Sequence, residues 1–165
     1  MPDQATVQRA KEDLREGKAP STAAGEFVHE EIEHVREGKH GARSPQQAVA
    51  IGLSKARRAG IPLKAPAKGK TSASTRKKAE RDYKEGQSGS KAKPSARRSR
   101  AREEALEREP KSTASRRSLS KATKKAAKKR SASSRSAAAA KAVRTRGKSG
   151  SRRAAKKAAR TRSRG

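Results

Sequence analysis

Apolar residues recur at helical spacing in the first third of the chain, and they predict three short helices. In the first, over residues 3–16, Val7, Ala10 and Leu14 fall on one face. An aspartate opens the segment, as a common N-cap residue, and Gly17 follows where a helix would end. The segment is therefore expected to be a helix that packs through a single apolar stripe.

The second predicted helix covers residues 21–37 and has the widest apolar face. Four of its apolar positions follow the i, i+4, i+8 and i+11 pattern of a helix, and a phenylalanine widens the stripe. Gly38 comes directly afterwards, where a left-handed residue commonly ends a helix. The face consists of Ala24, Phe27, Val28, Ile32 and Val35.

The third predicted helix covers residues 44–59 and has the strongest start signal in the chain. Ser44 is a suitable N-cap, Pro45 suits the first helical position, and Gln47 is able to close a capping box. The narrow apolar face contains two small residues one turn apart, which would let the second helix approach closely. This face consists of Val49, Gly52, Leu53 and Ala56.

The predicted fold class is all-α, with a small N-terminal module followed by a basic tail. Residues 1–62 form the module, a helical hairpin helped by the first helix or by self-association. Residues 63–109 are a linker with weak helical signals, near 74–85 and 96–109. In residues 110–165, like charges oppose helix formation and no apolar face is present, so we predict disorder with a tendency to become helical when the charge is neutralised.

The composition argues against one large core. Val, Ile, Leu and Phe make up 14 of the 165 residues, and the formal net charge is +30. Chains with so few large apolar residues and so much charge do not bury enough apolar surface to offset chain entropy. The absence of cysteine also excludes disulfides, thiolate metal sites and cysteine nucleophiles.

The charge is strongly asymmetric. Residues 1–62 carry a net charge of +1 and the remaining residues +29, and 21 basic residues follow the last acidic one, Glu109. Lysine and arginine bind polyanions by releasing condensed counterions from phosphates, without reading sequence. We therefore predict non-specific, electrostatically driven DNA binding of a histone-like kind, with compaction or protection of the nucleoid.

The two aromatic residues bear on which nucleic acid is bound. Phe27 and Tyr83 do not make a stacking platform for single strands. Duplex DNA is therefore favoured, and an RNA- or ribosome-associated protein is the first alternative. A protein-interaction module with a solubilising basic tail is the second. A membrane-active polycation is disfavoured because the tail lacks large apolar residues to insert.

We expect the tail to contact phosphates, and we expect two arginines of the third predicted helix to add further phosphate contacts. The module would set self-association or recruit a partner through its core. The predicted phosphate contacts are Lys121, Lys124, Lys125, Lys128, Lys129, Arg130, Arg144, Arg146, Arg152, Arg153, Lys156, Lys157, Arg160, Arg57 and Arg58. The predicted module core is Phe27, Val28, Ile32, Val35, Val49 and Leu53.

Enzyme chemistry is not expected. His29 and His34 lie five residues apart, so they point in different directions around a helix and do not bind one ion together. The glutamates around them are predicted to form a solvated polar face and to pair with Arg36, Lys39 or the basic tail. Acid–base catalysis needs a desolvated cleft that this composition does not provide. We therefore predict no catalytic residues, no metal site and no cofactor.

Localisation is predicted to be cytoplasmic and associated with the nucleoid. The longest apolar run, residues 48–53, is far shorter than the roughly 20 residues that span a bilayer. Acidic residues occupy the N-terminal region where a signal peptide has its apolar core.

The segment GEFVHEEIEHVREGKHGARSPQQAVAIGLSKARRAG, residues 25–60, resembles the defining segment of a bacterial protein family of unknown function. In that family a His/Glu-rich helix precedes a GKHGARS-type loop and a QAxAIGLSKAR helix. The resemblance implies a bacterial origin and assigns no activity, partner or site. Stretches such as KAPAKGK and KKAAKKR are also similar in composition to the tails of linker histones and bacterial histone-like proteins.

Overall fold

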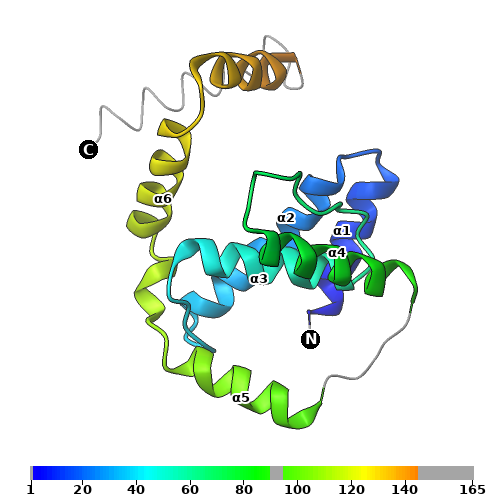
Figure 1. Ribbon diagram of the computed structural model, residues 1–165, viewed down its shortest axis with the longest axis vertical. Coiled ribbons are helices and arrows are strands. Elements are labelled where there is room, and N and C mark those ends of the chain that lie inside the picture. Colours follow the sequence, from blue (N-terminus) through cyan, green and yellow to red (C-terminus); the bar gives the residue numbers. More distant parts are fainter. Residues whose placement is uncertain (1, 90–94, 145–165) are drawn as a thin grey trace. The chain divides into compact units, whose positions relative to one another are not determined.

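A computed structural model describes residues 2–89 and 95–144 (Figure 1). The described residues are helices joined by turns, with no strand among them, which confirms the all-α prediction. The chain divides into two compact units, Met1–Ser120 and Lys121–Gly165. The elements are α1 (Gln4–Arg15), α2 (Pro20–Arg36), α3 (Pro45–Arg58), α4 (Ala73–Gln87), α5 (Ala96–Glu107), the 3₁₀ helix η1 (Lys111–Ala114) and α6 (Arg116–Lys128). Residues 132–144 form a further helix.

The predicted glycine stops and the serine cap of α3 are confirmed, whereas Asp3 precedes α1 without a capping hydrogen bond from its side chain. The Ser44 hydroxyl accepts a hydrogen bond from the Gln47 N–H at 3.2 Å and caps α3. Gly38 follows α2 with φ of 79°, a left-handed conformation that favours glycine. The N–H groups of Gly38 and Lys39 bond back to the carbonyls of Val35 and His34, which closes a Schellman motif.

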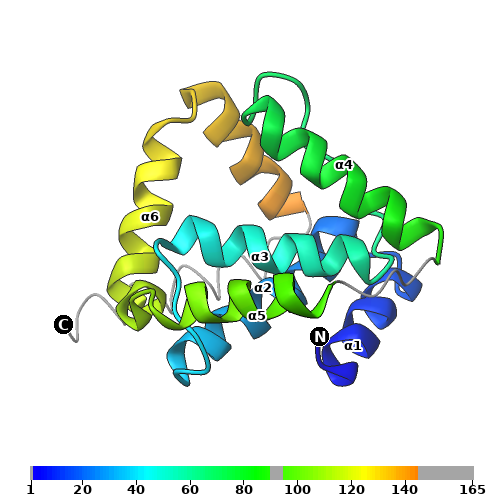
Figure 2. The same cartoon turned by 60° about the horizontal axis from the view of Figure 1, so that its bottom comes forward.

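The main core lies among α1, α2 and α3, where α2 packs against both neighbours (Figure 2). Phe27 of α2 is fully buried there, among alanines of α1, α2 and α3 and beside Ile61. Gly52 makes the close approach of α2 and α3, since a Cβ on it would stand 2.7 Å from the Val28 Cα. The prediction that small residues on the third helix admit the second is confirmed at this position.

A second, smaller core joins α2 and α3 to η1. Val35 packs against Ala42, Ala48 and Ala114, and all four are nearly or fully buried. Ala42 also donates its N–H to the Pro110 carbonyl at 3.2 Å. The chain around residues 110–114 is thus folded onto α2, although the sequence placed these residues at the start of the tail.

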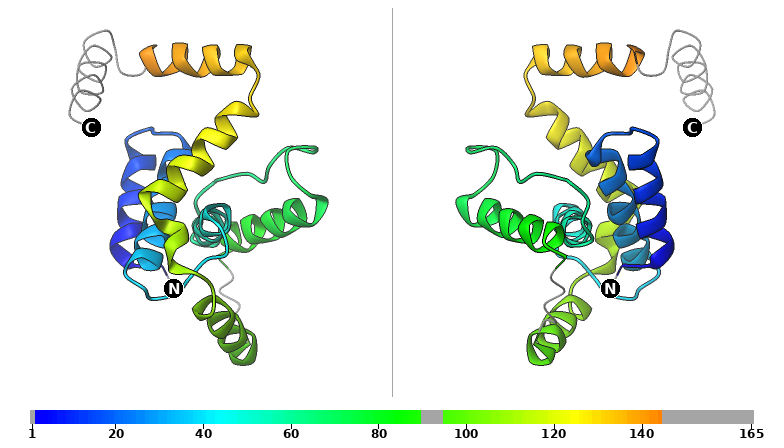
Figure 3. Two further views of the ribbon diagram at one scale, coloured as in Figure 1. Left: turned by 90° about the vertical axis from the view of Figure 1, so that its left-hand side faces the viewer. Right: turned by 90° about the vertical axis from the view of Figure 1, so that its right-hand side faces the viewer.

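α4 packs on α3, although the sequence placed it in a linker (Figure 3). Asp82 of α4 is buried and accepts hydrogen bonds from Ser54 and from two nitrogens of Arg58. Gly86 allows close contact, because a Cβ there would collide with the Arg57 carbonyl oxygen. The first unit therefore extends beyond residue 62, through polar pairs and backbone contact more than through an apolar stripe.

The predicted core residues fall into two groups. Phe27 and Val35 are fully buried, as expected. The others are half-buried: Val28, Ile32, Val49 and Leu53. Leu53 packs against the main core and Ile32 against the smaller one. In the described parts of the chain, no helix has the length and apolar character needed to cross a membrane.

Candidate functional site

Four lysines of α6 lie on one side of the helix. Lys121, Lys124, Lys125 and Lys128 follow at spacings of three, one and three residues, so they occupy about 100° of arc at 3.6 residues per turn. All four side chains are exposed. We call these four residues the cationic face.

Acidic side chains are missing from the sequence around the cationic face. No Asp or Glu occurs after Glu109, so no carboxylate of the same segment neutralises these lysines. Lys129, Arg130 and Arg144 are also exposed. The other predicted tail contacts lie outside the described residues: Arg146, Arg152, Arg153, Lys156, Lys157 and Arg160.

The charges of residues 1–62 are arranged differently, since many of them are paired. Arg9 contacts Glu26 at 2.8 Å, and Lys18 contacts both Asp13 and Glu16 at 2.7 Å. The hydrogen bonds that the Lys18 ammonium donates to these two carboxylates raise its pKa. Such pairs leave less uncompensated positive charge for a polyanion than the cationic face does.

Arg57 and Arg58 require a correction. Arg57 retains only 7% of its surface, and its guanidinium donates to the carbonyls of Leu63 and Leu53 at 3.1 and 3.4 Å. Burial lowers the pKa of Arg57. Arg58 is exposed, but its Nε and Nη2 both donate to Asp82 Oδ1, at 3.0 and 2.9 Å. Both arginines are engaged in contacts inside the first unit, so neither is an unpaired cation like the lysines of the cationic face.

The glutamates of α2 require a second correction. Glu31 is fully buried and Glu30 retains 6% of its surface, so the predicted solvated face is wrong at these two positions. Glu33 and Glu37 are more open and pair with Arg36 and Lys39, as predicted. Carboxylates are rarely buried without a partner that compensates their charge. A compensating group is therefore expected beside Glu31.

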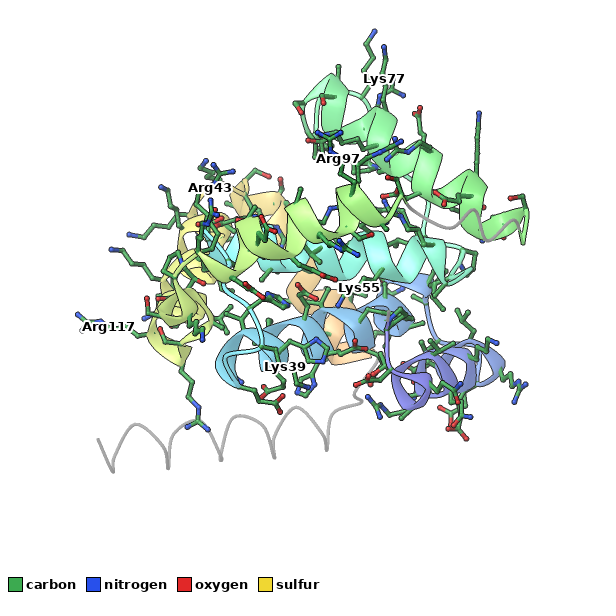
Figure 4. All side chains as sticks on the ribbon, turned by 90° about the horizontal axis from the view of Figure 1, so that it is seen from below. Lys39, Arg43, Lys55, Lys77, Arg97 and Arg117 are labelled. Atoms are coloured by element: carbon green, nitrogen blue, oxygen red, sulfur yellow. The ribbon has the colours of Figure 1, made fainter. Side chains whose placement is uncertain are left out.

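Glu31 lies between a lysine and a histidine that come from later in the chain. Lys55 of α3 extends toward α2, and its Nζ lies 2.6 Å from Glu31 Oε2 (Figure 4). His40 Nε2 lies 3.3 Å from Oε1. By distance the Lys55 contact is an ion pair and His40 is a close neighbour, yet neither carboxylate oxygen accepts a hydrogen bond of good geometry. The buried carboxylate is therefore compensated in charge but unsatisfied in hydrogen bonding.

Glu30 and His34 extend this cluster toward the N-terminus. Both Glu30 oxygens lie 3.4 Å from the Asp3 N–H, and Oε1 is 4.0 Å from His34 Nε2. The rings of His34 and His40 meet edge to face, with centroids 6.2 Å apart. One ligand atom each from Glu31, His34 and His40 lie within 4.8 Å of one another.

Sequence reasoning missed this cluster because it tested the wrong pair of histidines. His29 is exposed on α2, whereas His40 returns to the helix after the Gly38 turn. A signal was available in part, because His34 lies three and four residues after the two buried glutamates, on neighbouring parts of the helix surface. The contribution of Lys55 depends on how α3 packs, which local spacing does not specify.

Comparison with known proteins gives no identification. The chain matches no family model, no curated protein and no solved structure. The resemblance of residues 25–60 to a bacterial family of unknown function therefore stays a prediction.

Proposed function

We propose that this protein binds duplex nucleic acid non-specifically, with DNA as its principal partner, through the phosphate backbone. The cationic face of α6 is the observation that carries the proposal. It presents four exposed lysines on one side of a helix, in a segment without acidic residues. Contacts of this kind position a protein on a duplex without reading its bases.

The spacing of the cationic face suits a phosphate strand. Lys121 and Lys128 are seven residues apart, which is about 10 Å along a helix. Phosphates of one DNA strand follow every ~3.4 Å along the axis. Four lysines over that length therefore supply charge at nearly the density of the strand that they would face.

Other described side chains favour backbone binding over base recognition. Phe27 is buried and Tyr83 is half-buried, so neither offers an open ring for stacking. Arg57 and Arg58 of α3 are engaged inside the first unit, so they do not present a surface for reading bases. These features support a histone-like role in compacting or protecting DNA, with a cytoplasmic, nucleoid-associated location. The first unit would contribute self-association or a protein contact.

The experiment compares two full-length variants of equal net charge. One changes Lys121, Lys124, Lys125 and Lys128 to Gln, and the other changes four exposed lysines elsewhere, Lys68, Lys70, Lys77 and Lys78. Binding to a labelled random duplex is measured at several salt concentrations. We expect the first variant to reduce the slope of log K against log[salt] by about 3 to 4 units if all four lysines contact phosphates.

The control variant should change that slope by less than half as much. Equal losses in both variants would mean that net charge alone drives binding, and no loss in either would overturn the proposal. Competition with a structured RNA at fixed salt distinguishes the partners. A clear preference for RNA would replace DNA by the RNA- or ribosome-associated alternative.

A further inference from the structure

Glu31, His34 and His40 bring three metal-binding groups together at one place in the first unit. Two of them lie on α2, and the third follows in the loop that leads to α3. Glu31 is fully buried, and the His34 and His40 side chains retain only 14% and 17% of their surface. The three side chains are therefore mostly enclosed and do not form an exposed acidic patch.

The orientation of His40 suits a metal ligand. Its Nδ1 lies 3.0 Å from its neighbour's carbonyl oxygen, Gly41 O, which accepts a hydrogen bond when Nδ1 carries the proton. The neutral ring then directs the lone pair of Nε2 toward Glu31. Histidines that bind metals commonly donate their other ring N–H to a carbonyl or a carboxylate in this way.

The distances also suit a tetrahedral ion. Zinc bonds to nitrogen and oxygen are about 2.0–2.1 Å long, so two ligand atoms on a tetrahedral ion stand roughly 3.4 Å apart. His40 Nε2 and Glu31 Oε1 are 3.3 Å apart. The three candidate ligand atoms lie within 4.8 Å of one another, so small side-chain rotations would bring them onto one centre.

The unmet hydrogen-bonding capacity of Glu31 is the independent observation. Both of its oxygens are buried without a hydrogen-bond donor in good geometry. A buried carboxylate in that condition is costly unless a cation binds it. Lys55 compensates the charge at Oε2, which leaves Oε1 facing His40.

We propose that Glu31, His34 and His40 bind a divalent transition-metal ion, with zinc as the best match. Glu31 binds through Oε1 and His40 through Nε2, and water occupies the remaining position. Two imidazoles and one carboxylate form a ligand set that zinc takes readily. Lys55 stays on the second carboxylate oxygen and holds the Glu31 side chain in place.

The ion would stabilise the first unit where α2 meets the loop that follows it, beside a core that consists mainly of alanines. It would tie α2 to the loop of residues 39–43. The same loop bonds to the following segment, because Gly41 N–H donates to Leu106 O at 2.8 Å and Ala42 N–H to Pro110 O at 3.2 Å. Small domains commonly gain stability from a structural metal in this way.

The test is a calorimetric titration of zinc chloride into the untagged, metal-stripped full-length protein. We expect one equivalent to bind with a dissociation constant in the micromolar range or below. His34→Ala and His40→Ala should each weaken binding by at least about tenfold. His29→Ala is the matched control, because His29 is exposed on the same helix and outside the ligand set, and it should change the affinity less than twofold.

Circular dichroism of each variant tests whether the helices remain formed. If either histidine variant loses its helices, the wild-type protein still decides the question through cobalt(II). A four-coordinate cobalt site gives a strong visible spectrum, and this spectrum should disappear when zinc is added. Absence of both zinc binding and the cobalt spectrum would overturn the proposal. An equal loss of affinity in His29→Ala and His40→Ala would overturn it as well.

Discussion

Lys55 Nζ of α3 lies 2.6 Å from Oε2 of Glu31 on α2, and Glu31 is fully buried. The pair joins the two helices of the main core at a position where apolar residues would be expected. The Lys55 side chain keeps 25% of its surface, so solvent screens one end of the interaction. Removing one partner therefore leaves a buried charge, while removing both does not.

Lys55→Met tests this asymmetry. It should lower the free energy of unfolding by about 2–3 kcal/mol, somewhat below the 3–5 kcal/mol typical of a fully buried pair because Lys55 is partly exposed. Urea denaturation in a buffer with EDTA measures the change without any metal contribution. The double variant Lys55→Met/Glu31→Gln should recover most of the loss. A double variant no more stable than Lys55→Met would contradict this account.

Gly52→Ala tests the close approach of α2 and α3. The added Cβ would stand 2.7 Å from the Val28 Cα and 2.9 Å from the Phe27 carbonyl oxygen, so the helices must separate. We expect a loss of about 2–3 kcal/mol, in the range of other overpacked cores. Gly25→Ala is the matched control, since Gly25 is exposed within α2 and its Cβ would meet nothing within 4 Å.

The control substitution should raise stability by about 0.5–1 kcal/mol, because alanine is the better helix former. Thermal denaturation of both variants measures the two changes. Equal effects of the same sign would show that both substitutions act only through the difference in helix propensity between glycine and alanine. In that case the contact between α2 and α3 would not depend on Gly52.

Asp82→Ala tests whether α4 belongs to the folded unit. Asp82 is buried and accepts hydrogen bonds from Arg58 and from Ser54, the latter at 2.6 Å. Its loss should cost about 2 kcal/mol, since hydrogen bonds to charged groups contribute about 1.5–3 kcal/mol. Glu80→Ala removes a partly exposed pair with Arg76 on the same helix and should cost under about 1 kcal/mol. Hydrogen exchange should increase along α4 only in Asp82→Ala.

Much of the N-terminal fold is predictable because its signals are local. The predicted helices at 3–16, 21–37 and 44–59 differ from α1, α2 and α3 by one residue at each end. Serine caps, glycine stops and apolar spacing act within one or two turns, so the sequence displays them directly. The Gly52 contact followed from the same kind of pattern.

The parts that were missed depend on contacts between distant segments. α4 packs through Asp82 and Gly86, neither of which contributes to an apolar period. The buried Glu31 depends on Lys55 and His40, and both positions follow from how α3 and the preceding loop fold back on α2. Arg57 was assigned to phosphate from its charge, while its burial depends on the chain around Leu63. Charge patterns alone do not distinguish a paired or buried residue from an open one.

Ala126→Pro tests whether the cationic face acts as a helix. Proline inside α6 breaks the helix without changing net charge, so Lys121 and Lys128 would no longer lie on one face. We expect duplex affinity at low salt to fall about three- to tenfold, because the lysines must then be ordered on binding at an entropic cost. Ala132→Pro is the control, since residue 132 begins the next helix and proline is tolerated at a first helical position. It should leave the affinity within about twofold. Equal affinity of both variants and the wild type would show that the segment binds as an unstructured polycation, and that charge density without helical register is sufficient.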